Sequence, residues 1–288
     1  MIWPKVADPS GTLSAISCWD PGDCVAVNDA GFAYQSSDGT WSEPVLADSA
    51  MGDLSALSCP ASGVCFAVDT LGYVFKLSGG KWAAGPKIDP GPFDVSGLIW
   101  LSCASTTFCL AGDGDGNVFE MRGSSWTPIT SFSNSLWAVS CASATFCMGA
   151  NGHNQLVEFN GTSSVVTGSL LAGGGGSLSL SCTSAEFCAA VSASEGATVW
   201  DGTSWSSPVN VEGDGDGAIT SVSCVGPSFC TLVDSAGRDS VYNGISWSAP
   251  APISAGKAPD LIAVSCSSET NCAAISASNE VYSGGSSS

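Results

Sequence analysis

Short apolar runs separated by polar turns recur along the chain, and two cysteines stand at the ends of each pair of runs. One example is the stretch Leu57-Ser58-Cys59-Pro60-Ala61-Ser62-Gly63-Val64-Cys65-Phe66-Ala67-Val68-Asp69. Apolar residues that alternate with small polar ones predict a strand with one buried face. The Asp, Asn, Ser and Gly residues after the second run favour a tight hairpin. The stretch therefore predicts two strands, the first ending at the first cysteine and the second starting at the second cysteine.

This unit occurs seven times with a period of about forty residues. In every copy a serine precedes the first cysteine, and an apolar residue stands two positions before it. A third strand with an aromatic residue follows, and then an outer strand that usually carries Trp and Pro, which an edge strand tolerates. The aromatic residues are Tyr34, Phe75, Phe119, Phe159, Trp200, Tyr242 and Tyr282. Seven units of four short antiparallel strands predict an all-β, seven-bladed β-propeller.

A single domain over residues 1–288 accommodates all the units, with blades at about 8–48, 49–92, 93–131, 132–171, 172–213, 214–255 and 256–285. The last unit is one strand short, and residues 1–7 supply it. Because Trp3-Pro4-Lys5-Val6 has the composition of the outer strands, we expect it to complete the seventh blade and close the ring. A closed ring needs none of the polar caps that end a linear repeat array.

All 14 cysteines fall into pairs of this kind. A short hairpin brings two cysteines close enough for a disulfide. Zinc is the alternative, but pairs in different blades do not gather four ligands, and His153 is the single histidine. We therefore expect one disulfide per blade, joining Cys18 to Cys24, Cys59 to Cys65, Cys103 to Cys109, Cys141 to Cys147, Cys182 to Cys188, Cys224 to Cys230 and Cys266 to Cys272.

Cysteine usage indicates a secreted protein, and the charge disfavours two classes of partner. Paired cysteines in this number are typical of an oxidising compartment. The start Met1-Ile2-Trp3-Pro4-Lys5 lacks the pattern of a signal peptide, so we expect the export signal to be absent from this chain. The net charge of −19 repels nucleic acid and anionic membranes, and no apolar run of about 18 residues predicts membrane insertion. We expect a secreted monomer.

The seven units, with their Ser-Cys-x5-Cys and Gly-x-x-Trp elements, resemble the disulfide-bearing propeller repeats of secreted bacterial proteins, actinobacterial ones in particular. The turns Ser37-Asp38-Gly39-Thr40-Trp41 and Asp201-Gly202-Thr203-Ser204-Trp205 are also similar to the Asp-box of sialidase-type propellers and to repeats of propeller lectins. They lack the Ser-x-Asp-x-Gly spacing of a full Asp-box, so they share only its hairpin geometry. The resemblance implies the fold of the whole chain, and it does not choose a function.

Three tryptophans, Trp19, Trp100 and Trp137, fall outside the repeated positions. Trp100 and Trp137 stand just before the first cysteine in adjacent blades, where an aromatic platform near the axis could stack on a sugar ring. Trp19 lies between two paired cysteines, on the opposite face. Alternatively, the three rings fill the central channel or the space between blades. We treat all three as candidate ligand-binding residues.

Two acidic loops are candidate calcium sites. Asp113, Asp115 and Asn117 offer oxygen atoms at alternate positions, as calcium loops do. Asp113 also occupies the hairpin position of Asp69 and Asp234, which explains it without a metal. Asp214 and Asp216 have no such repeated position and either bind a cation or solubilise a loop. No other cofactor is expected.

Catalysis has little support in the sequence. His153 lies in a hairpin turn without a nucleophile to activate, and every cysteine is paired. Arg122 and Arg238 belong to separate blades, so the arginine cluster of a sialidase is missing. We therefore expect a non-enzymatic, lectin-like binding module whose partner is a glycan. The alternatives are a protein-interaction scaffold that uses an acidic face, and a glycoside hydrolase with two facing carboxylates.

Overall fold

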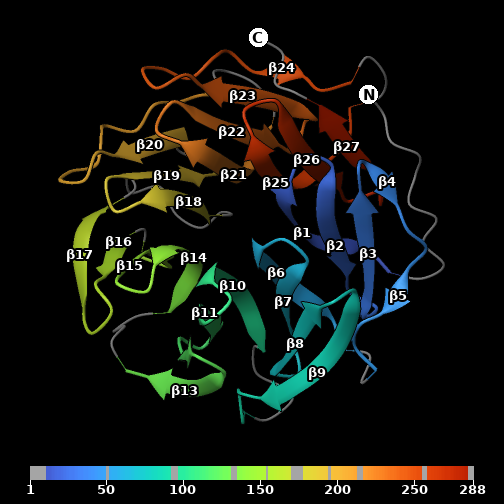
Figure 1. Ribbon diagram of the computed structural model, residues 1–288. Helices are drawn as coiled ribbons and strands as arrows, with labels where there is room; N and C mark the ends of the chain where they lie inside the picture. Colours follow the sequence, from blue (N-terminus) through green and yellow to red (C-terminus); the bar gives the residue numbers. More distant parts are fainter. Residues whose placement is uncertain are drawn as a thin grey trace.

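The computed structural model describes residues 11–49, 52–91, 97–130, 135–153, 155–169, 178–193, 196–212, 217–254 and 258–284. Over these ranges the strands form seven antiparallel sheets arranged in a ring around a central axis (Figure 1). The predicted all-β, seven-bladed propeller is therefore confirmed. No helix in the described ranges is long and apolar enough to cross a membrane.

In the first four blades the strands follow one another outwards from the axis (Figure 1). The first blade contains β1 (Leu13–Asp20), β2 (Asp23–Asn28), β3 (Phe32–Ser37), β4 (Thr40–Trp41) and β5 (Val45–Leu46). The second contains β6 (Leu54–Ala61), β7 (Val64–Asp69), β8 (Tyr73–Ser78) and β9 (Lys81–Lys87). The third contains β10 (Leu98–Ser105), β11 (Phe108–Asp113), β12 (Val118–Arg122) and β13 (Ser125–Ile129). The fourth contains β14 (Leu136–Ser143), β15 (Phe146–Asn151), β16 (Gln155–Phe159) and β17 (Ser164–Ser169).

The last three blades have shorter outer edges. The fifth contains β18 (Leu178–Ser184), β19 (Phe187–Ser192) and β20 (Gly196–Trp200), and its outer edge is reduced to isolated bridges at Trp205 and Val209. The sixth contains β21 (Ile219–Gly226), β22 (Phe229–Asp234), β23 (Arg238–Tyr242) and β24 (Ala251–Pro252). The seventh contains β25 (Leu261–Ser268), β26 (Asn271–Ser276) and β27 (Val281–Gly284). The predicted closing strand, residues 3–6, lies outside the described residues.

All seven predicted disulfides are present, each between the two inner strands of one blade. Their Cα atoms are 3.9–4.0 Å apart, because the paired cysteines face each other directly across the ladder, as Cys18 does Cys24. The expectation that the first strand ends at the first cysteine is wrong. In each blade this strand continues two residues further, as β1 does to Asp20, because a β-bulge after the cysteine lets a tighter turn close the hairpin.

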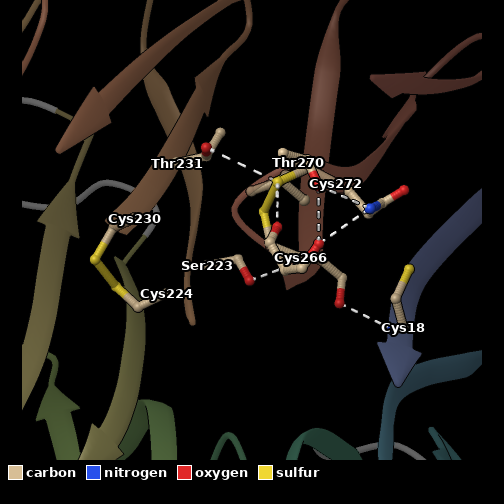
Figure 2. Close-up of a disulfide and its surroundings, with 12 residues drawn as sticks. Cys18, Ser223, Cys224, Cys230, Thr231, Cys266, Thr270 and Cys272 are labelled. Atoms are coloured by element: carbon tan, nitrogen blue, oxygen red, sulfur yellow. Dashed lines mark hydrogen bonds between the residues drawn. A yellow bond between two sulfur atoms is a disulfide. The ribbon is translucent and has the colours of Figure 1, made fainter. Parts of the chain in front are cut away.

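The serine before each first cysteine connects neighbouring blades. Its Oγ accepts a hydrogen bond from the backbone N–H of the first cysteine in the next blade, at 2.9–3.1 Å. Figure 2 shows the bond between Ser223 and Cys266, and the bond that reaches Cys18. The seven acceptor–donor pairs are Ser17 with Cys59, Ser58 with Cys103, Ser102 with Cys141, Ser140 with Cys182, Ser181 with Cys224, Ser223 with Cys266 and Ser265 with Cys18. The inner strands are thus joined in an unbroken ring.

The hydrophobic core lies between the blades, where the second and third strands of one blade face the preceding blade. In the junction between the fifth and sixth blades, the ring of Phe187 packs 6.1 Å from that of Tyr242, which packs 5.3 Å from Trp247. Similar clusters fill the other junctions. Each blade therefore buries apolar side chains against its neighbours.

Candidate functional site

A cavity of about 180 Å³ opens between the seventh and first blades, at the junction that we call the seam. Its lining includes Trp41 and Ser36 from the first blade. The seventh blade contributes Ser267, Thr270 and Asn271. Figure 2 views this junction, with Thr270 and Cys272 of the seventh blade on one side and Cys18 of the first blade on the other.

The seam cavity exists because a residue that is a large aromatic in four other blades is a smaller, polar one here. We call the residue immediately before the second cysteine the plug position. In the third to sixth blades it is a buried phenylalanine that packs into the next junction: Phe108, Phe146, Phe187 and Phe229. In the seventh blade it is Asn271.

On the facing side of the seam, the first blade also has a small side chain where other blades have a ring. The residue opposite the second cysteine is Phe159, Trp200 or Tyr242 in the fourth to sixth blades, so a plug ring meets another ring there. In the first blade Ser36 pairs with Trp41 on the outer strand, and it faces the cavity. The aromatic residue of this blade, Tyr34, stands two positions earlier on the strand, so the ring expected at the seam is displaced.

The junction between the first and second blades is filled in another way. Its plug position holds Asp23, and Trp19 packs instead against the cluster that contains Phe75 and Leu77. Trp19 is thus half-buried between two blades, which corresponds to the space-filling alternative for this candidate. The seam has no plug phenylalanine, and it has no tryptophan at the position of Trp19, where Ser267 stands.

The described lining of the seam cavity is uncharged, and it combines polar side chains such as Asn271 with apolar ones such as Trp41 and Val281. No Asp, Glu, Lys, Arg or His is among the described residues that line it. The amide nitrogen of Asn271 donates to Ser268 Oγ at 3.0 Å and to Thr270 Oγ1 at 3.1 Å, which fixes the side chain in place. No hydrogen bond within the described residues reaches its amide oxygen, which is left for a donor. Trp41 lines the same cavity from the first blade.

Trp100 is buried, with 5% of its surface exposed. In the first two blades Ser14 and Ser55 donate to the carbonyl oxygens of the leucines that begin the next inner strand. The third blade has Ile99 at that position, and Trp100 Nε1 donates to Leu136 O at 2.8 Å instead. The ring of Trp100 therefore ties the third blade to the fourth and is covered by both, as in the space-filling alternative.

Trp137 is 45% exposed and lies on the neighbouring inner strand, β14. Its indole ring lies against Gly152, where an added Cβ would be 2.9 Å from Cζ2. Ile99, at the equivalent position of β10, is 40% exposed. Trp137 and Ile99 are thus exposed apolar residues at equivalent positions of adjacent inner strands, and the buried Trp100 is not exposed beside them.

The Asp113 loop uses its oxygen atoms internally. Asp113 Oδ1 accepts the N–H groups of Asp115 and Asn117, and Oδ2 accepts from the amide of Asn117 at 2.6 Å. This arrangement fits the hairpin explanation. Asp214 and Asp216 lie outside the described residues. Across the described ranges, His, Cys, Asp and Glu side chains do not gather in threes in a metal-binding arrangement.

The two arginines are both occupied by carboxylates. Arg122 pairs with Glu120 at 2.7 Å. Arg238 bridges Asp234 and Glu212. Burial raises the pKa of Glu212 to about 7, an effect that Asp234 strengthens and Arg238 opposes. These groups form structural pairs in two distant blades and do not converge on one substrate.

The sequence contains two substitutions that distinguish the seam from the other junctions. An alignment of the seven units places Asn271 where four units have Phe. It also places Ser267 at the position that Trp19 occupies in the first unit. The position of Ser36 depends on the register of the third strand, which shifts the aromatic residue by two between blades. The shift is present in the sequence, since Tyr34 stands 10 residues after Cys24 and Tyr242 stands 12 residues after Cys230, but the structure is needed to show that Ser36 then faces the junction.

No protein-family model matches the sequence, and a search of curated proteins finds no match. Solved structures do match the fold. They include YCF48 bound to a D1 peptide, with 11% identity, a TM-score of 0.75, and coverage of 99% of this chain and 94% of that chain. The WD40 propeller domain of Doa1 has 11% identity, a TM-score of 0.76 and coverage of 98% and 95%. A streptogramin B lyase has 9% identity, a TM-score of 0.78 and coverage of 97% and 95%.

These comparisons define the class of the protein: it is a seven-bladed β-propeller. At 9–11% identity the likeness shows the fold alone. The similar proteins include a peptide-bound chain and a lyase, so the fold does not indicate one function. Any function must be argued from the site.

Proposed function

We propose that this protein is an extracellular binding module that takes a neutral, hydroxyl-rich ligand, a sugar residue of a glycan, in the seam cavity. The single observation that carries the proposal is the cavity itself, where Asn271 replaces a plug phenylalanine opposite Trp41. A sugar ring offers an apolar face for the indole and hydroxyl groups for the amide oxygen of Asn271. The absence of charge in the described lining matches an uncharged ligand, and it supplies no carboxylate for glycoside hydrolysis.

The extracellular assignment has separate support. Seven disulfides are stable in an oxidising environment and are rare in the cytosol. This agrees with the resemblance to secreted bacterial propellers, which we extend to this chain as part of the proposal. The high negative charge keeps such a module away from phosphate-rich surfaces.

A glycan array tests the proposal. We expect binding to a subset of glycans, and we expect Trp41→Ala to raise the Kd for the best ligand about tenfold by removing the stacking surface. Trp137→Ala is the matched control, because this ring lies in another blade, and it should leave the affinity unchanged. An array without hits, or equal affinity in wild type and Trp41→Ala, would contradict the proposal.

The second candidate is protein binding, favoured by the exposed pair Ile99 and Trp137. Large exposed apolar side chains on adjacent strands are typical of contact surfaces. A YCF48 propeller binds a D1 peptide, so a propeller of this shape can hold a peptide. If this candidate is correct, Trp137→Ala weakens capture of an extracellular partner while Trp41→Ala does not. Association through the acidic surface would also weaken steeply with salt, whereas sugar stacking would not.

A further inference from the structure

The hairpin between the second and third strands is built on the same side-chain motif in five blades. The last residue of the second strand is Asn28, Asp69, Asp113, Asn151 or Asp234. One side-chain oxygen of each accepts the N–H groups two and four residues later. In the second blade Asp69 Oδ1 accepts from Leu71 at 3.0 Å and from Tyr73 at 2.6 Å.

The blades differ in the partner of the second carboxylate oxygen of this residue. In the third blade Asn117, four residues later, donates to Asp113 Oδ2. In the sixth blade Arg238, also four residues later, donates to Asp234 Oδ2 at 2.5 Å. In the second blade this residue is Tyr73, and Asp69 Oδ2 is buried without a hydrogen-bond partner among the described residues. Asp69 itself is 0% exposed.

A second buried carboxylate lies beside it. Asp48, in the connection that leads into the second blade, is also 0% exposed, and its Oδ2 accepts the N–H of Gly52 at 2.6 Å. Both carboxylates lie against Gly52, where an added Cβ would be 2.7 Å from Asp69 Oδ2 and 3.0 Å from Asp48 Oδ2. Gly52 thus leaves room for two carboxylate oxygens to approach each other.

The sixth blade contains the same pair of carboxylates with a cation between them. Gly217 takes the place of Gly52, and an added Cβ there would be 2.7 Å from Asp234 Oδ2 and 2.5 Å from Arg238 Nη2. The guanidinium bridges Asp234 to Glu212, which, like Asp48, lies in the connection into its blade. The corresponding residue of the second blade, Tyr73, brings no charge. Two buried carboxylates close together are stable only with a cation or a shared proton.

We propose that Asp48 and Asp69 bind a hard divalent cation, calcium, at the entrance to the second blade. Calcium accepts carboxylate, backbone carbonyl and water oxygens in flexible geometry, so two carboxylates form the charged part of its shell. On the outer strand, Lys87 Nζ lies 5.9 Å from the centre of the Tyr73 ring. This site is separate from the Asp113 loop and from the seam cavity.

Calcium binding and thermal unfolding test the proposal with the full chain. Equilibrium dialysis with radioactive calcium at pH 7.5 should show a bound ion that is lost in Asp69→Asn. With calcium at about a hundred times its Kd, the Tm of wild type should rise by about 5 °C over the value in chelator, and that of Asp69→Asn should not rise. The variant is expected to fold, because Asn28 and Asn151 occupy the same position in two other blades.

Asp113→Asn is the matched control, since it makes the same change in the third blade and should keep the calcium response. A wild-type protein that binds no calcium would overturn the proposal and assign a shared proton to the pair. An equal calcium response in wild type and Asp69→Asn would also overturn it, by placing the ion elsewhere. Loss of the response in Asp113→Asn alone would assign the ion to the Asp113 loop.

Discussion

Ser265 Oγ accepts a hydrogen bond of 2.9 Å from the backbone N–H of Cys18, so the last repeat is joined directly to the first. The bond between Ser140 and Cys182, inside the chain, joins the same two kinds of group, a serine Oγ and a cysteine N–H, at the same distance. The ring of inner strands is therefore closed without the outer strand of the seventh blade. Small size alone would explain a serine before each first cysteine. In the structure this serine also accepts a hydrogen bond in all seven junctions.

The first prediction concerns this closure. Ser265→Ala leaves the partly buried N–H of Cys18 without its acceptor, so we expect the free energy of unfolding to fall by about 1 kcal/mol. Ser140→Ala, which removes the same bond within the chain, should have a similar effect. Urea denaturation followed by tryptophan fluorescence measures both variants. Unchanged stability in Ser265→Ala would show that the seam is held by other contacts.

The second prediction concerns the disulfides. Mass spectrometry of the unreduced protein should find all 14 cysteines oxidised, with each disulfide linking cysteines six positions apart. Replacing Cys103 and Cys109 together by alanine should lower stability by about 2 kcal/mol, since the closed loop is short. Cross-blade pairing in the peptide map would be inconsistent with the fold.

The third prediction concerns Trp100, which faces Gly112 across the ladder. An added Cβ on Gly112 would lie 2.1 Å from Trp100 Cζ2, so the glycine makes room for the ring. The first two blades have Ala and Val at these two positions. We expect Trp100→Ala to cost about 3–5 kcal/mol through the cavity it leaves, and Gly112→Val to be destabilising through overpacking.

The double variant Trp100→Ala with Gly112→Val rebuilds the pair found in the first two blades, so it should recover part of the stability lost in each single variant. A double-mutant cycle of denaturation free energies measures the coupling. Strictly additive losses would show that the two residues do not pack as a unit.

The fourth prediction concerns pH. Burial raises the pKa of Asp69 from 3.8 to about 6, and the carboxylate of Asp48 adds to the rise. Because the folded state binds this proton more tightly than the unfolded state, the resulting stabilisation is complete below about pH 4 and lost as the pH rises through about 6. In chelator, the urea midpoint of wild type should therefore fall between pH 4 and pH 7 by more than that of Asp69→Asn. If the urea midpoints of wild type and Asp69→Asn changed equally with pH, the raised pKa of Asp69 would be contradicted.

The fold was predictable from the sequence because every blade repeats the same pattern. Ser-Cys pairs, apolar runs and turn residues recur about every forty residues, so strand order and disulfides follow from a single unit. The predicted closing strand, Trp3-Pro4-Lys5-Val6, and the loop with Asp214 and Asp216 lie outside the described residues. Their predictions therefore stay as stated.

The site was harder to predict, because it depends on contacts between units. Trp100 departs from the repeat, but its hydrogen bond to Leu136 and its match with Gly112 make it part of the scaffold. The difference that accompanies a cavity is the replacement of a phenylalanine by Asn271. The sequence makes such a missing ring less conspicuous than an extra tryptophan. Whether this loss leaves space depends on the facing residue, Ser36, and only the structure shows that Ser36 and Asn271 line the same cavity.

The most direct test of the central claim is a calorimetric titration of Asn271→Phe with the best glycan from the array. This change installs the plug residue of the third to sixth blades, so the protein is expected to fold with a Tm no lower than that of wild type. The account predicts that binding disappears while stability is kept. Wild-type affinity in Asn271→Phe would contradict it and show that the seam cavity is not the binding site.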